Sequence, residues 1–348
     1  MRFIEFVRPD INIDFIGKKN IFFMISLLLI SISIISLIIH KGPRKGVDFA
    51  GGSSIQIKFN EPVDLDTIKR GLAPLGLEKA SLQQFGGKSE NEFQIRTDIS
   101  SMNNGDFQEK FVEAMKTATG KTVEILGTEV VGPQVSQDLR SKAMLAILYS
   151  ILFITIYISG RFEMKWMLSG AMAGVLMGAV YLLTLLKVGA TVISIGALIV
   201  ALVFCWYLGL KYALGAIVAL IHDVTITVGI FSLMDLEFNL PIVAAILTII
   251  GYSLNDTIIV FDRIRENLKK NSKGTLQANI NRSVNETISR TILTSLTTLI
   301  TVLALLFLGG GTVHDFAFAM TVGIIVGTYS SIYIASPILI LWQEYAYS

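Results

Sequence analysis

Three ionisable side chains lie inside long apolar runs of this 348-residue sequence. They are His222 and Asp223, in the run at 213–234, and Asp256, in the run at 240–260. A charged side chain at the centre of a bilayer costs about 3 kcal/mol on insertion scales, so each of the three is a candidate functional residue. Burial disfavours the charged form of a carboxylate. The chemistry that these residues suggest is therefore the binding and release of a proton.

Asp256 has more polar neighbours than the other two. It follows Asn255 in the stretch 251–257, where glycine, tyrosine, serine and threonine indicate an internal, hydrated position. We therefore favour a proton-carrying role over the alternative, a polar contact that only holds helices together. For His222 and Asp223 both interpretations stay open, because adjacent polar side chains can satisfy each other.

Arg290 begins the next apolar run and is followed by threonines at a spacing of three and four. This spacing places their hydroxyls on one helix face. Such a face can hold water beside a proton path, or each hydroxyl can bond back to its own helix. Arg290 can extend to the membrane surface or pair with Asp256 when that carboxyl is ionised. The threonines are Thr291, Thr294, Thr298 and Thr301.

The elements that must position these side chains are predicted to be membrane-spanning helices. Hydrophobic residues make up 52% of the sequence and charged residues 16%, against about 25% charged in soluble domains. Apolar runs long enough to cross about 30 Å of hydrocarbon begin with residues 21–39, after a tail at 1–20. The first run is too long for a cleavable signal core. The other seven are near 143–159, 166–186, 190–208, 213–234, 240–260, 290–308 and 315–342.

Residues 41–141 are predicted to form a soluble domain, because charged and turn residues replace the apolar runs there. Strands are expected at 54–59, 80–85, 92–97 and 122–131, with helices at 64–75 and 106–118. This βαββαβ order is that of a ferredoxin-like α+β domain. The fold class is thus a polytopic α-helical membrane protein of about eight spans with one such domain outside the cytoplasm. Residues 142–346 form the transmembrane bundle.

Other kinds of site are not supported by the sequence. The turn Gly-Gly-Lys-Ser at 86–89 lacks the first glycine of a phosphate-binding loop, since position 82 is Leu82. The single cysteine, Cys205, excludes an internal disulfide. We therefore expect no enzyme activity, cofactor, metal, nucleotide or nucleic acid.

The short loops indicate the orientation of the chain. One side carries fourteen Lys and Arg residues and the other side only Lys187. Basic loops stay in the cytoplasm. Both termini are therefore predicted to be cytoplasmic, and the soluble domain is predicted to be periplasmic.

A weak internal repeat relates residues 165–171 to residues 211–216. The helix pair at 166–208 is either a duplicated hairpin or a product of convergent membrane composition. The sequence leaves these two possibilities open.

Five stretches resemble the SecD/SecF family of protein-export membrane proteins. They are residues 46–52, 131–136, 219–223, 251–267 and 289–295, of which the last three are closest to the SecF members. Together they extend over nearly the whole chain apart from 166–208. The family signature after the first span is represented by Gly46, Asp48, Phe49, Gly51 and Gly52.

The resemblance implies a subunit of the bacterial inner membrane, related to resistance-nodulation-division transporters. It implies that the proton-motive force is used to assist late stages of translocation through SecYEG. The implied partners are SecD, SecYEG, YajC, the unfolded polypeptide in transit and the bilayer. SecF members usually have six spans, so we expect the additional pair at 166–208 to lie at the periphery.

The resemblance assigns Asp256 and Arg290 to the proton pathway. Two other functions remain as alternatives: a proton-coupled exporter of small molecules, and a passive scaffold for the translocon. The candidates for the proton pathway are Asp256 and Arg290, followed by Asp223, His222, Asn255 and Thr294.

Overall fold

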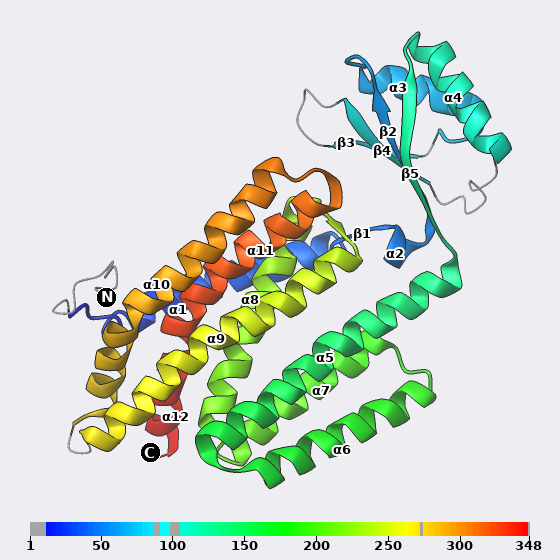
Figure 1. Cartoon of the computed structure of the whole chain (residues 1–348). Coiled ribbons are helices and arrows are strands. Elements are labelled where there is room, and N and C mark those ends of the chain that lie inside the picture. The colour runs from blue at the N-terminus through cyan, green and yellow to red at the C-terminus, as the bar shows by residue number, and fades with distance from the viewer. Residues whose placement is uncertain (1–11, 79, 86–90, 98–104, 272–273, 347–348) are drawn as a thin grey trace.

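The computed structural model of this chain describes residues 12–78, 80–85, 91–97, 105–271 and 274–346. Long helices form a bundle, and a small domain of strands and helices lies beyond one end of it (Figure 1). The turn predicted at 86–89 lies outside the described residues. The elements of the small domain are β2 (Gly52–Phe59), α3 (Leu65–Leu72), η1 (Ala73–Leu75), β3 (Ser81–Phe85), β4 (Glu92–Thr97), α4 (Gly105–Thr119) and β5 (Val123–Val131).

The small domain is built on one antiparallel sheet with the strand order β3-β4-β2-β5. Because successive side chains of a strand point to opposite faces, Ile55, Ile57 and Phe59 of β2 share one face. All three are buried in one core with Ile68 of α3 and Phe111 of α4. The periodic apolar residues of these elements thus give the domain a core separate from that of the bundle.

The described residues contain eight helices long and apolar enough to cross a membrane, which confirms the predicted number. Several extend beyond the apolar runs that predicted them, because polar turns continue the helix outside the hydrocarbon. The last span consists of α11, a π-helical turn and α12. The elements of the bundle are α1 (Lys19–Ile39), α5 (Pro133–Glu163), α6 (Trp166–Leu185), α7 (Ala190–Tyr207), α8 (Lys211–Leu233), α9 (Leu240–Lys270), α10 (Leu276–Leu308), α11 (Gly311–Ser330), η2 (Ser331–Ala335) and α12 (Ser336–Ala346).

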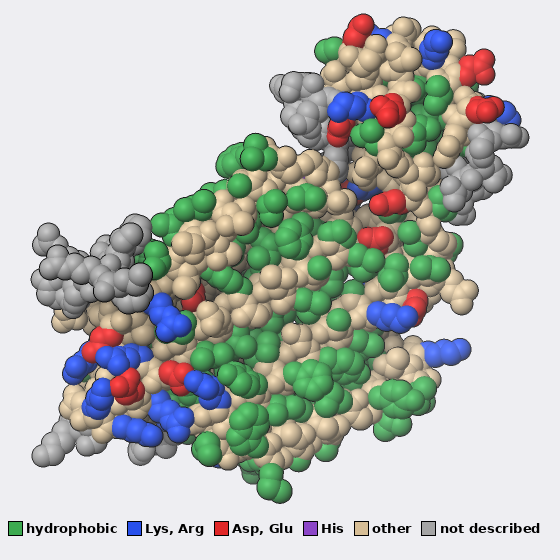
Figure 2. Space-filling model, in the orientation of Figure 1, with side chains coloured by type: hydrophobic (Ala, Val, Ile, Leu, Met, Phe, Trp, Pro, Cys, Tyr) green, Lys and Arg blue, Asp and Glu red, His purple; other side chains and the backbone are tan. Residues whose placement is uncertain are grey.

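Helix α8 is the centre of the bundle and packs against α1, α5, α7, α9, α11 and α12. Of its apolar stretch 67% is buried, against 28% for α6 and for α7. Helix α6 packs against α5 and α7 at one side of the bundle (Figure 1). Figure 2 shows apolar side chains along the helices and most of the bundle's Lys and Arg side chains at the end far from the small domain.

Two short segments of the chain pair with each other at the end of the bundle next to the small domain (Figure 1). Strand β1 (Arg44–Lys45) and the one-turn helix α2 (Val47–Ala50) follow α1, and β6 (Glu237–Phe238) lies between α8 and α9. β1 and β6 pair in parallel. The segment after the first span therefore contacts the start of α9 (Figure 1).

Glycines let α11 approach α9 closely. A Cβ at Gly327 would lie 2.9 Å from the Cβ of Ser253, and one at Gly323 would overlap Ile249. The other glycine series of the sequence, on α6, has open space around it: nothing lies within 4 Å of a Cβ built at Gly170, Gly174 or Gly178. Of these two series, the one on α11 lies at a close contact between helices and the one on α6 does not.

Replacing either α11 glycine should destabilise the bundle. We expect Gly323→Val and Gly327→Val each to lower the free energy of unfolding by about 1–3 kcal/mol, because added volume in a packed interface forces helices apart. The matched control is Gly174→Val, whose effect should stay within about 0.5 kcal/mol. Equilibrium unfolding in detergent micelles measures all three. Equal effects at Gly174 and Gly327 would contradict the packing described above.

Candidate functional site

Asp256 lies where α9, α10 and α11 meet, and only 1% of it is exposed. The hydroxyl of Ser295 on α10 donates to its Oδ2 at 3.3 Å, and the same hydroxyl lies 2.7 Å from Thr328 Oγ1 on α11. A short polar chain thus crosses three helices in a largely apolar interior. A carboxyl in such a position can bind a proton without disturbing a tight charge pair.

Arg290 lies on α10, five residues before Ser295, and is exposed in the single chain. Within the described residues no salt bridge of 4.0 Å or less joins it to Asp256. The two side chains therefore lie on neighbouring helices without forming an ion pair in the described structure.

Asp223 is completely buried at the middle of α8. Its Oδ1 accepts a hydrogen bond from Nδ1–H of His222 at 2.9 Å. Its Oδ2 accepts from the hydroxyls of Ser253 on α9, at 2.6 Å, and Ser330 on α11, at 2.8 Å. The two side chains thus contact each other, and Asp223 in addition bonds to two further helices.

Ser253 connects the two buried carboxylates through α9. It donates to Asp223 and lies one turn before Asp256 on the same helix. His222 stacks on Tyr329, with ring centroids 5.9 Å apart, and its buried Nε2 has no hydrogen-bond partner in the described structure. One ring nitrogen next to Asp223 is thus left without a bond inside the protein.

The hydroxyl face predicted on α10 bonds mostly to its own helix. Thr294 donates to the carbonyl of Arg290 at 3.0 Å, and Thr298 to that of Thr294 at 3.0 Å. Thr291 is buried and its hydroxyl has no partner among the described residues. Asn255 is exposed on α9 and turned away from Asp256. The structure therefore groups Asp256 with Ser295 and leaves Asn255 outside this group.

The three serines that bind the carboxylates, Ser253, Ser295 and Ser330, were missed by the sequence analysis. Each is a single small polar residue within an apolar helix, and such residues are common at helix contacts in membranes. The one signal for Ser253 is its position three residues before Asp256, which places both on one helix face.

The residues of the family signature lie at the junction between the bundle and the small domain. Asp48 Oδ2 accepts the backbone N–H of Leu240 at 2.9 Å, at the first turn of α9. Gly46 N–H donates to the carbonyl of Phe238 at 2.8 Å. The signature thus contacts α9, the helix that carries Asp256, at the start of that helix.

Two family models match the chain. The model described as "Protein export membrane protein SecD/SecF, C-terminal" matches residues 111–202 and 177–345. The model described as "SecD/SecF GG Motif" matches residues 36–63. The chain belongs to the SecD/SecF family. The resemblance found in the sequence is thereby confirmed.

Individual relatives place the chain with the SecF members. It is 40% identical over 334 residues to "Protein translocase subunit SecF" of Magnetococcus marinus, covering 95% of this chain and 92% of that protein. It is also 40% identical over 352 residues to the protein of the same name from Calditerrivibrio nitroreducens, covering 98% of this chain and 97% of that protein.

Solved structures of SecDF have the same fold over nearly all of this chain. The crystal structure of Thermus SecDF matches 97% of the chain with a TM-score of 0.72 and 30% identity. The match covers 40% of the SecDF chain. A second structure, titled "SecDF in Super-membrane-facing form", matches with a TM-score of 0.62 and 32% identity. This SecF-type chain is thus a multi-pass membrane protein that corresponds to about two fifths of SecDF.

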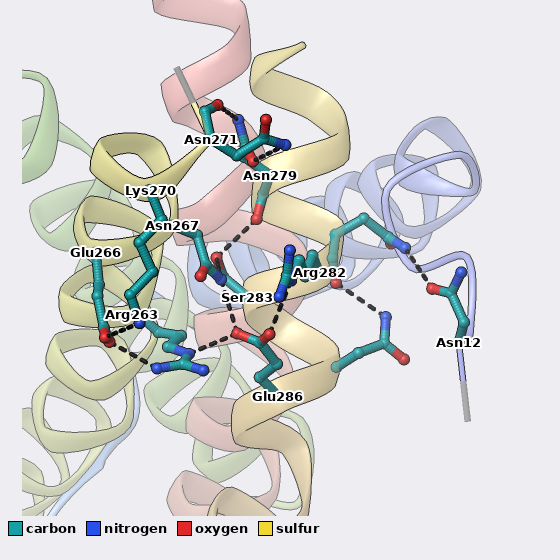
Figure 3. Close-up of polar contacts among 12 residues, drawn as sticks. Asn12, Arg263, Glu266, Asn267, Lys270, Asn271, Asn279, Arg282, Ser283 and Glu286 are labelled. Carbon is teal, nitrogen blue, oxygen red and sulfur yellow. Dashed lines mark hydrogen bonds and ion pairs between the residues drawn. The ribbon is translucent and has the colours of Figure 1, made fainter. Parts of the chain in front are cut away.

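A network of polar contacts ties α9 to α10 at the end far from the small domain (Figure 3). Glu286 Oε2 accepts from Arg263 Nε at 2.5 Å and from Asn267 Nδ2 at 2.7 Å. Asn267 Nδ2 also lies 2.9 Å from the hydroxyl of Ser283. Glu286 lies one turn before Arg290 on α10. The network therefore holds α10 against α9 one turn before Arg290.

Asn267 is the buried member of this network, with 2% of it exposed. We expect Asn267→Ala to lower the free energy of unfolding by about 1–3 kcal/mol, because the buried Ser283 and the carboxylate of Glu286 each lose a donor. The matched control is Lys270→Ala, which removes an exposed ion pair with Glu266 and should cost less than about 1 kcal/mol. Unfolding in micelles compares the two, and a smaller loss for Asn267→Ala than for Lys270→Ala would refute the prediction.

An exposed polar stripe runs along α9 and α10 within the apolar stretches. On α9 it includes Thr248, Gly251 and Asn255, and on α10 it includes Thr297 and Thr301. Polar side chains in membrane helices generally face protein or water rather than lipid. The stripe is thus a polar surface on two helices of this SecF-type chain, and its threonine hydroxyls donate to carbonyls of their own helices.

Proposed function

We propose that this chain is the SecF subunit of a SecD–SecF complex that uses the proton-motive force to assist late stages of translocation through SecYEG. The observation that carries the proposal is the position of Asp256. Its carboxyl is buried among three helices and accepts a hydrogen bond from the hydroxyl of Ser295. The named relatives are protein translocase subunits, and a buried exchangeable carboxyl is what a proton-driven member of that family requires.

The proposed cycle alternates the charge on Asp256. When Asp256 is protonated, the buried charge is removed and α9, α10 and α11 can pack closely around Ser295. When the proton leaves towards the cytoplasm, the carboxylate attracts Arg290 and the helices rearrange. Asp223 and His222 are further candidates for the path, since Ser253 lies between Asp223 and the turn that carries Asp256. Thr294 and Asn255 are weaker candidates, because the first bonds to its own helix and the second is exposed.

The energy of one proton is adequate for this work. One charge that crosses 100 mV supplies about 2.3 kcal/mol, which biases an equilibrium about 50-fold. The work done on the polypeptide would be to move the small domain, so that an emerging chain does not slide back.

We infer that both termini are cytoplasmic in the bacterial inner membrane and that the small domain is a periplasmic, ferredoxin-like domain. The count of fourteen basic residues against one supports this orientation. Lys19 Nζ lies 3.4 Å from Glu344 Oε1, so both described ends of the chain meet. They lie at the end of the bundle far from the small domain (Figure 1). The strand order β3-β4-β2-β5 supports the ferredoxin-like assignment.

The polar stripe on α9 and α10 is the proposed contact with SecD. A SecD helix packed there would cover Asn255 and Arg290 and would close the site around Asp256. SecYEG, YajC and the translocating polypeptide are proposed partners that rest on the family alone. The bilayer covers the remaining apolar face, including the exposed sides of α6 and α7.

Two alternatives give different results in simple assays. An exporter of small molecules would move fluorescent substrates out of cells when the protein is overproduced. A passive scaffold would tolerate neutral replacements of Asp256 and Arg290 that keep their volume. A single small domain has too little surface to enclose a drug-binding cleft, which favours translocation over efflux.

The proposed function is tested in inner-membrane vesicles that contain the chain with SecD. A precursor is arrested midway through SecYEG, ATP is withheld, and a proton gradient is then imposed. We expect translocation to be completed with the gradient and to stop when an ionophore collapses it. Completion that is independent of the gradient would overturn the proposal in favour of the scaffold.

A further inference from the structure

The segment after the first span is attached to the start of α9. β1 pairs with β6 through Arg44 opposite Glu237 and Lys45 opposite Phe238. A Cβ at Gly46 would lie 3.0 Å from the Cβ of Asn239, so the two segments touch at their backbones. The first span and α9 are thus joined at this end, although they are far apart in sequence.

Asp48 is bonded directly to the first turn of α9. The first N–H groups of a helix have no acceptor within the helix, and a carboxylate near them is also favoured by the helix dipole. Asn239 satisfies the N–H of Ile242 at 3.3 Å, and Asp48 satisfies that of Leu240 at 2.9 Å. The second of these acceptors comes from a different segment of the chain, so α9 cannot shift along its axis without breaking the bond or moving Asp48.

Glu237 connects the same place to the small domain. Its side chain is 3% exposed and forms ion pairs with Arg96 of β4 and, at 3.7 Å, with Arg44. Burial and the charge of Arg44 lower the pKa of Arg96 to about 10, so its guanidinium group remains charged at neutral pH. A buried carboxylate between two cations is costly to leave unpaired. Glu237 therefore holds the sheet of the small domain against the turn that precedes α9.

A cavity of about 600 Å³ lies beside this ion cluster. Arg44 and Glu237 line it from the connecting segments, and Leu77, Ser81 and Arg96 line it from the small domain. The two parts are thus joined by charged contacts around an open space instead of a continuous apolar interface. Such a boundary can open and close without exposing a core.

The small domain has a second attachment, at which β5 continues into α5 through Gly132. Helix α2 packs on α5 beside this point, where a Cβ at Gly51 would lie 3.3 Å from Ser136 Oγ. A body held at two points tilts when one point moves relative to the other. A shift of α9 relative to α5 would therefore rotate the small domain about Gly132.

We propose that residues 44–48 and 237–240, which we call the junction, form a joint through which movement of α9 tilts the small domain. Asp48 and Glu237 are its positioning residues, and neither takes part in proton exchange. This inference rests on the proposed function, because it takes protonation of Asp256 as the event that moves α9. It gives the family signature a mechanical role.

The test uses the full chain with SecD in liposomes, in a Cys205→Ala background, and measures distances between pairs of spin labels. The distance between labels at Lys110→Cys and Leu308→Cys, the small-domain pair, reports the position of the small domain relative to the bundle. The distance between labels at Lys269→Cys and Tyr207→Cys, the α9 pair, reports the position of α9 relative to α7. Asp256→Asn serves as the constantly neutral form. In the parent, we expect Asp256→Asn to shift both distances.

The junction variants are Asp48→Ala and Glu237→Ala. Each should abolish the shift of the small-domain pair and leave the shift of the α9 pair unchanged. Asp48→Asn, which keeps an acceptor for the N–H of Leu240, should restore the small-domain shift. The matched control is Asp138→Asn on α5, a carboxylate outside the junction that pairs with Lys142 and is 58% exposed, and it should have no effect.

Two outcomes distinguish failure of the proposed joint from failure of the proposed function. If the small-domain distance still follows Asp256→Asn in both junction variants, the joint is overturned and the proposed function stands. If Asp256→Asn shifts neither pair in the parent, the proposed proton-driven movement is overturned, and the joint with it. The α9 pair also shows whether each variant keeps its fold, since a misfolded bundle would no longer give the parent's distance between these two labels.

Discussion

Asp256→Asn is expected to slow the proton-driven completion of translocation by about 50-fold, the bias that one proton supplies at 100 mV. The amide has nearly the volume of the carboxyl and can still accept from Ser295, so the bundle should assemble normally. It cannot bind and release a proton, so the cycle stops in one arrangement. The measurement is the rate at which an arrested precursor completes translocation in vesicles after a proton gradient is imposed.

The matched control for this experiment is Asp262→Asn, which changes an exposed aspartate of the same helix that pairs with Arg161 at 2.5 Å. Exposed ion pairs contribute little to stability, so its rate should equal that of the parent. Both variants must copurify with SecD in equal amounts. If Asp256→Asn completes translocation as fast as Asp262→Asn, Asp256 is a structural residue and the scaffold interpretation replaces the motor.

Asp223→Ala is expected to lower the free energy of unfolding by about 3–5 kcal/mol. The change removes the acceptor of three buried donors, from His222, Ser253 and Ser330. These donors belong to three different helices, so the loss affects the contacts of α8 with α9 and α11 together. Equilibrium unfolding in detergent micelles measures the effect.

Two further variants show whether the loss of stability comes from the hydrogen bonds of Asp223. Asp223→Asn keeps an acceptor and should cost less than Asp223→Ala, and Ser330→Ala removes one donor and should cost about 1 kcal/mol. A loss below about 1 kcal/mol for Asp223→Ala would contradict a structural role. If Asp223→Asn is stable but does not support gradient-driven translocation, Asp223 belongs to the proton path with Asp256.

The repeated match of the family model bears on the additional helix pair. Residues 177–202 fall in both matched segments, and this overlap lies within the additional pair. In the structure Glu163, at the end of α5, accepts the N–H of Tyr212 at the start of α8 at 2.9 Å. Helices α5 and α8 thus pack together, and α6 and α7 lie outside them. This arrangement fits a duplicated hairpin and convergent composition equally, and the choice between them stays open.

The helices and strands were largely readable from local patterns. The predicted strand at 92–97 is β4, and the predicted helix at 106–118 is α4 with one more residue at each end. Alternating apolar residues and long apolar runs produce these patterns whatever the partner elements are. The ends of the long helices were less predictable, since α9 and α10 continue as polar helix beyond the apolar runs at 240–260 and 290–308.

The candidate site was only partly readable. Asp256, Asp223 and His222 stand out because a charge within an apolar run is rare. The hydroxyls of α10 had two possible partners, and the choice of the backbone carbonyls by Thr294 and Thr298 depends on what packs against that face. Asn255 resembled a site residue because it precedes Asp256, but adjacent residues of a helix point in different directions.

The sequence by itself determined the eight membrane-capable helices and the buried carboxyls. The thickness of the hydrocarbon and the cost of burying charge act on each segment separately. Only the tertiary structure decided which side chains meet those carboxyls and how the small domain is attached. Ser330 lies 107 residues from Asp223, and Asp48 lies 192 residues from Leu240. Contacts over such separations depend on how whole helices pack, and no local pattern of residues encodes them.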